Sequence, residues 1–162
     1  MVSHAVVAAR SRAETGRSDR AMHAVSHIAW GDAPETHRGD TPHNWAIGAA
    51  LHHGASVFWA GFFEALFGRR AERSTAAALT GGATIAAAAY VTDYHVVPKR
   101  FTPGFEAHLS NRSLLLVYAG LAVGLAAAAR LRGLYRHQVE NRDERDERRY
   151  PQRRPDAVIT PE

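Results

Sequence analysis

Cysteine is absent from the sequence, and lysine occurs only once, as Lys99. Without cysteine the chain has no disulfide bond, no thiolate metal site and no cysteine nucleophile. Also missing are a Gly-rich phosphate-binding loop, a GxSxG motif and the paired-carboxylate pattern of a hydrolase. These absences leave an enzymatic activity without support, although they do not exclude one.

The N-terminal residues lack a long apolar run. Residues 5–9 are apolar, but this run is shorter than the ~7 to 15 residues of a signal peptide's apolar region, so no cleaved signal is evident. Residues 1–18 show no sustained hydrophobic period and are expected to form a mobile arm. From residue 19 a short amphipathic helix is expected at the membrane surface, where Trp30 suits the headgroup zone.

Charged and apolar residues are strongly segregated along the chain. Residues 75–92 and 113–129 contain no Asp, Glu, Lys, Arg or His, whereas residues 130–154 are dominated by Arg, Glu and Asp. The net charge is +4. Because the arginines flank the apolar segments and alternate with acids in the tail, this pattern favours anionic lipid headgroups over nucleic acid as the partner.

Three segments are long and apolar enough to cross a bilayer, at residues 44–68, 75–97 and 113–131. The first follows Thr41 and Pro42, which suit an N-cap and a first helical residue. Its 25 residues, at ~1.5 Å each, exceed the ~30 Å hydrocarbon core. The sequence therefore predicts an all-α membrane bundle of three transmembrane helices, with an interfacial N-terminal helix and a charged cytoplasmic C-terminal helical extension.

The second span is rich in Ala, Gly and Thr, and Ser74 can cap its start. Such a helix inserts only marginally alone and is expected to need neighbours. Small residues let helices approach closely in lipid, and the third span carries a GxxxG arrangement. Helix-packing positions are therefore predicted at Ala78, Gly82, Ala86, Gly120 and Gly124.

The chain is expected to divide into an arm at 1–18, a membrane domain at 19–132 and a charged tail at 133–162. With three spans, residues 69–73 lie on the same side of the membrane as the tail. Twelve of the 20 basic residues then lie on that side, and the positive-inside rule places the C-terminus in the cytoplasm. The expected location is the bacterial inner membrane.

Histidine is frequent, with ten residues, and a polar cluster is expected in the outer half of the bundle from His52, His53, Asp93 and His95. Imidazoles and a carboxylate in a low-dielectric setting could bind a transition metal or a haem, or relay protons. Alternatively, these groups hydrogen-bond between helices and to interfacial water, which fixes the bundle geometry. Glu64 has two similar interpretations, a functional acid facing the bundle or a side chain that snorkels to the interface.

Three segments resemble an uncharacterised family of small bacterial integral membrane proteins. They are AVSHIAWGD at 24–32, HHGASVFWAGFFEALFG at 52–68 and DYHVVPKRFTPGFE at 93–106, and the resemblance covers residues 20–132. It implies a membrane location and adds no reaction. It also implies a further apolar helix before AVSHIAWGD, so that residues 1–10 could be the tail of that helix in a longer, four-span form.

The leading hypothesis is an inner-membrane protein with a structural or interaction role. Its partners would be the lipid bilayer and either a second copy or another membrane protein, and its charged C-terminal helix would offer a cytoplasmic docking surface. The alternative is a membrane protein that handles a metal, a haem or protons through the histidine and aspartate cluster. A soluble all-α protein that buries its apolar helices in an oligomer is the remaining alternative.

Overall fold

The computed structural model describes residues 2–31 and 41–149, and in these ranges the chain is all-helical, with no strand. The α-helices are α1 (Val2–Thr15), α2 (Arg20–Val25), α3 (His27–Trp30), α4 (Pro42–Arg73), α5 (Thr75–Val91) and α6 (Asn111–Arg149). A π-helical turn, η2 (Thr92–Val96), continues α5, and two 3-10 turns, η3 (Lys99–Phe101) and η4 (Phe105–Ala107), lead to α6. Residues 150–162 of the expected tail lie outside the described residues.

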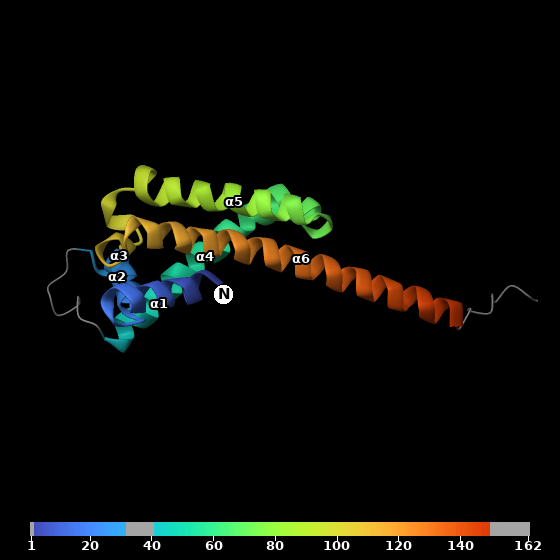
Figure 1. Ribbon diagram of the computed structural model, residues 1–162, viewed down its shortest axis with the longest axis horizontal. Coiled ribbons are helices and arrows are strands. Elements are labelled where there is room, and N and C mark those ends of the chain that lie inside the picture. Colours follow the sequence, from blue (N-terminus) through green and yellow to red (C-terminus); the bar gives the residue numbers. More distant parts are fainter. Residues whose placement is uncertain (1, 32–40, 150–162) are drawn as a thin grey trace, which may run out of the picture.

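The three long helices form the body of the molecule. Figure 1 shows α5 and α6 side by side and antiparallel, with α4 crossing them, and each of the three contacts the other two. Helices α1 and α2 lie at the end where α6 begins. Beyond the bundle, α6 continues as a single straight helix whose side chains at 134–149 are exposed.

Local capping defines the boundary between α4 and α5 and the start of α4. The Thr41 side chain accepts a hydrogen bond from the Asn44 backbone N–H at 3.2 Å, and Pro42 follows as the first helical residue. Ser74 ends α4, and its hydroxyl accepts from the Ala77 N–H at 3.3 Å. The caps predicted at Thr41 and Ser74 are therefore confirmed.

Two described segments, Thr75–Val96 and Asn111–Arg149, are long and apolar enough to cross a membrane. Helix α4 has the length, at 32 residues, but is not among these segments. Its apolar stretch contains His52, His53 and Glu64, which lower its mean hydropathy. By length and composition, the structure thus supports two of the three predicted spans.

Small residues bring α5 against α6. Ala78, Gly82 and Ala86 are all buried. A Cβ added at Gly82 would lie 2.5 Å from the backbone carbonyl oxygen of Ala122 on α6. The two backbones are therefore close enough here that only glycine fits without a shift.

Residues 2–15 form helix α1 instead of the expected mobile arm. Their buried side chains are Ser3, Val7 and Ser11, which recur at every fourth position along one helical face. Because two of the three are serine, this buried face leaves no hydrophobic period in the sequence. Helix α1 therefore belongs to the folded core.

Helix α1 packs against the GxxxG arrangement of α6. A Cβ on Gly120 would lie 2.9 Å from the Val6 side chain, and one on Gly124 would lie 3.5 Å from Val2. On the other side of this core, a Cβ on Gly48 of α4 would collide with the Met22 carbonyl of α2. Helix α2 is accordingly buried between α1 and α4 rather than lying only at an interface, with Ala21, Met22 and Val25 in the core.

We expect Gly82→Ala to lower the free energy of unfolding by about 1 to 3 kcal/mol, because the new methyl group overpacks a backbone contact. The matched control is Gly61→Ala on α4, where nothing lies within 4 Å of an added Cβ and the unfolding free energy should stay the same or rise. Thermal unfolding of the purified protein in detergent measures both. Equal losses in the two variants would show that α5 and α6 do not meet at Gly82.

Candidate functional site

The polar residues predicted as one cluster fall into two separate groups. Asp93 and His95 lie on the π-helical turn η2, while His52 and His53 lie on α4. The Asp93 carboxylate accepts a hydrogen bond from the hydroxyl of Tyr118 on α6 at 2.6 Å. The His95 ring packs against Tyr90, with 5.7 Å between ring centroids.

The second group is centred on His52 and includes a histidine that sequence reasoning did not select. The ring of His4 on α1 meets the His52 ring edge to face, with centroids 4.6 Å apart and an interplanar angle of 67°. The ring of Phe105 on η4 also packs against the His52 ring, with the two centroids 5.6 Å apart. The sequence did not indicate His4 as a member of the cluster, because residues 1–18 show no hydrophobic period typical of a helix.

Two nitrogen atoms of this histidine pair are buried without a hydrogen-bond partner among the described residues: Nδ1 of His4 and Nε2 of His52. Native proteins leave few buried polar atoms unsatisfied, and an ion or a water molecule often accounts for the exceptions. The pair places two such atoms on neighbouring rings, while His23 Nδ1 and the Tyr94 hydroxyl are the other side-chain atoms in this state among the described residues.

The spacing of the pair restricts what it could bind. Two imidazoles on opposite sides of one metal have ring centroids ~6 Å apart, because each metal–nitrogen bond is ~2 Å. The observed 4.6 Å separation is too short for axial ligation of a haem between the two rings, and it fits only neighbouring positions on one ion. Among the described residues, no group of three or more His, Asp or Glu side chains is placed to hold a metal ion.

At the end of the bundle where α6 begins, Glu14 of α1 binds the start of that helix. Its carboxylate accepts hydrogen bonds from the Ser110 N–H at 2.6 Å and the Ser110 hydroxyl at 2.9 Å, and from the hydroxyl of Ser113. These bonds, led by the Ser113 hydroxyl, lower the pKa of Glu14 to about 2. An ionised carboxylate at a helix N-terminus is also favoured by the helix dipole.

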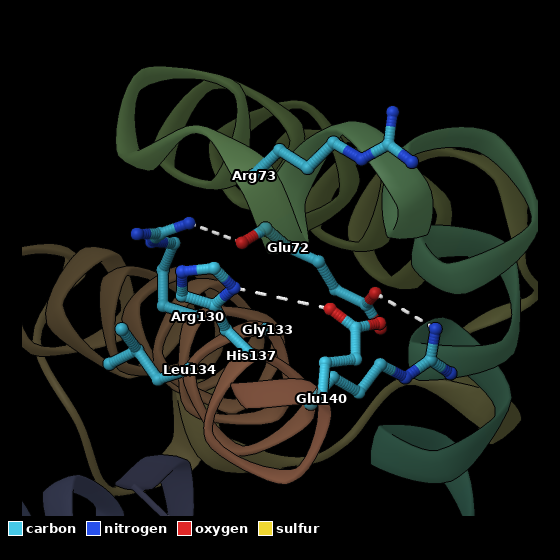
Figure 2. Close-up of a pocket in the computed structure, with 8 residues that line it drawn as sticks. Glu72, Arg73, Arg130, Gly133, Leu134, His137 and Glu140 are labelled. Carbon is cyan, nitrogen blue, oxygen red and sulfur yellow. Dashed lines mark hydrogen bonds and ion pairs between the residues drawn. The ribbon is translucent and has the colours of Figure 1, made fainter. Parts of the chain in front are cut away.

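At the opposite end, acidic residues of α4 pair with arginines of α6. Glu64, for which a functional acid and a side chain that snorkels to the interface were the two interpretations, forms an ion pair with Arg132. Glu72, which sequence reasoning did not select, pairs with Arg136 at 3.2 Å and with Arg132 at 3.8 Å. Figure 2 shows this junction, where Arg130 also donates to the backbone carbonyl of Glu72.

The chain matches no protein-family model, and comparison with curated proteins and with solved structures finds no significant match.

Proposed function

We propose that the chain is an integral protein of the bacterial inner membrane, with spans formed by α4, by α5 with its π-helical turn, and by α6, and with a structural or interaction role. The observation that carries this proposal is an exposed apolar stripe on α4. Phe58, Phe62 and Leu66 follow one another at intervals of four residues and are 59%, 46% and 64% exposed. Lipid is the environment in which such a stripe is stable.

The apolar surface continues around the other two long helices. Leu79 and Val91 on α5 and Leu115, Leu116 and Val123 on α6 are exposed. A soluble protein seldom presents so many large apolar side chains on adjoining helices. The same surface therefore supports three spans rather than two.

The low mean hydropathy of α4 is compatible with a membrane position, because its polar side chains meet protein groups. His52 contacts His4 and Phe105, and Glu64 pairs with Arg132. A hydropathy average counts these residues as though they faced lipid. The His52 ring is packed between helices, whereas the Glu64 and Arg132 side chains are 46% and 48% exposed and pair toward the charged end of α4.

The charges support a cytoplasmic C-terminus. Basic residues concentrate at the end of α4 and along α6 beyond Arg130, on the side that the positive-inside rule assigns to the cytoplasm. There α6 leaves the bundle as an exposed helix that carries both signs of charge. We infer that this extension is the docking surface for a partner.

The absence of native cysteine allows a direct test of this topology. We expect Glu147→Cys, on the exposed extension, to resist a membrane-impermeant maleimide in intact spheroplasts and to react after lysis. Lys99→Cys, exposed on the opposite side, should react in both. As a matched control, Val123→Cys within α6 should react slowly even after lysis. Labelling of Glu147→Cys in intact spheroplasts would refute the orientation, and rapid labelling of Val123→Cys in lysed membranes would refute the span.

One observation favours a second candidate function, transition-metal binding by the His4 and His52 pair, namely their unpartnered buried nitrogens. If so, protein purified in detergent should carry a stoichiometric metal that is lost in His52→Ala. The metal should remain in His95→Ala, whose ring packs on Tyr90 instead. Elemental analysis with a visible spectrum decides this, and metal-free wild-type protein would eliminate the candidate.

A further inference from the structure

We propose that the junction between α4 and α6 binds the phosphate head group of an anionic phospholipid from the cytoplasmic leaflet. The inference rests on the proposed function, because it needs this end of the bundle to lie at the membrane surface. The junction forms a cavity of about 410 Å³ that is open to the surroundings. Its lining includes Arg73 from α4 and Arg130, Gly133, Leu134, Arg136 and His137 from α6.

The cavity exists because the last turn of α4 lies directly on α6. A Cβ on Gly133 would collide with the carbonyl oxygen of Glu72, so glycine is needed for this approach. Arg130 donates a hydrogen bond to the same carbonyl. The end of one helix and the side of the other thus form two walls of the cavity, as Figure 2 shows.

Two guanidinium charges at the cavity are not neutralised by a carboxylate. Arg73 makes no ion pair within the described part of the chain, and the partner of Arg130 is a neutral backbone carbonyl. In Figure 2 Arg73 extends from the α4 wall and Arg130 from the α6 wall, with the Arg73 guanidinium directed away from Arg130. A phosphate group held at Arg130 would also meet a donor from α4 once the flexible Arg73 side chain turns toward it.

The acidic groups of the cavity already have partners. The Glu72 carboxylate pairs with Arg136 and Arg132, and Glu140 lies 3.9 Å from His137 Nδ1. The lining carries three arginines against two glutamates, an excess of one positive charge before His137 is counted. Glu72 is paired with arginines, and neither Arg73 nor Arg130 forms an ion pair with a carboxylate among the described residues.

Apolar side chains beside the cavity distinguish a phospholipid from a free anion. Leu134 lines the cavity and is 53% exposed, and Leu131 beside it is 66% exposed. Both follow directly on the apolar run of α6, which ends at Arg130. A ligand with a phosphate group and acyl chains would contact the arginines and the leucines together, as anionic lipids do in basic pockets between membrane helices.

The test is native mass spectrometry of the full chain in detergent, titrated with cardiolipin, phosphatidylglycerol and phosphatidylethanolamine. We expect the two anionic lipids to bind more tightly than the zwitterionic one. Arg73→Gln should weaken anionic lipid binding about fivefold, and Arg73→Gln with Arg130→Gln by more, at ~1 kcal/mol per arginine. The matched control, Arg142→Gln with Arg145→Gln on the extension of α6, should change binding less than twofold.

Three results would overturn the proposal: no preference for anionic lipids, equal losses in the site and control variants, or inorganic phosphate competing as effectively as lipid. Because Arg73 has no partner within the described residues, Arg73→Gln should leave the thermal unfolding temperature unchanged, which separates lost binding from misfolding. The proposed topology fails separately, through cysteine labelling. If the labelling pattern is as expected and lipid selectivity is absent, only the lipid site is refuted.

Discussion

The outward-facing apolar side chains of α4, α5 and α6 determine which solvent this bundle requires. Phe58, Phe62 and Leu66 cover one side of α4, and leucines and valines of α5 and α6 continue the surface. In aqueous solution, covering these side chains would require a protein partner with an apolar surface of similar size. A bilayer would supply that environment directly, and this is the basis of the proposed membrane location.

Several polar groups form specific pairs at the two ends of the bundle and between its helices. Glu14 holds the first turn of α6 at one end, and Glu72 meets Arg136 at the other. Between them, Asp93 accepts from Tyr118 across two elements. In a low-dielectric medium an unpaired polar group is costly, so these pairings fix how the helices are arranged. The same rule makes the unpaired nitrogens of His4 and His52 notable, and it makes Arg73 and Arg130 available to an anion.

Local signals in the sequence were sufficient for the starts of α4 and α5. Thr41 with Pro42 and Ser74 act through hydrogen bonds within one turn, so the pattern predicts them directly. The small residues around Gly82 lie where the structure packs α5 against α6, because small size is itself the physical requirement. Helix α1 could not be predicted from hydrophobic periodicity, since its buried face is two-thirds serine.

Tertiary packing decides which residues surround each histidine of the predicted cluster. The sequence could place His52 and Asp93 toward the same end of the bundle, but it could not specify how far one helix is rotated relative to another. The π-helical turn directs Asp93 to Tyr118, and α1 brings His4 to His52. Glu72 was overlooked for the same reason, because its arginine partners are more than 50 positions away along the chain.

The most direct measurement of the central claim is the environment of the α4 stripe in a bilayer. A spin label attached at Phe62→Cys in proteoliposomes should collide more often with dissolved oxygen, which concentrates in hydrocarbon, than with a water-soluble nickel chelate. A label at Glu144→Cys on the extension should show the reverse. If the Phe62 label were relaxed mainly by the nickel chelate, α4 would face water, and the three-span account would be contradicted.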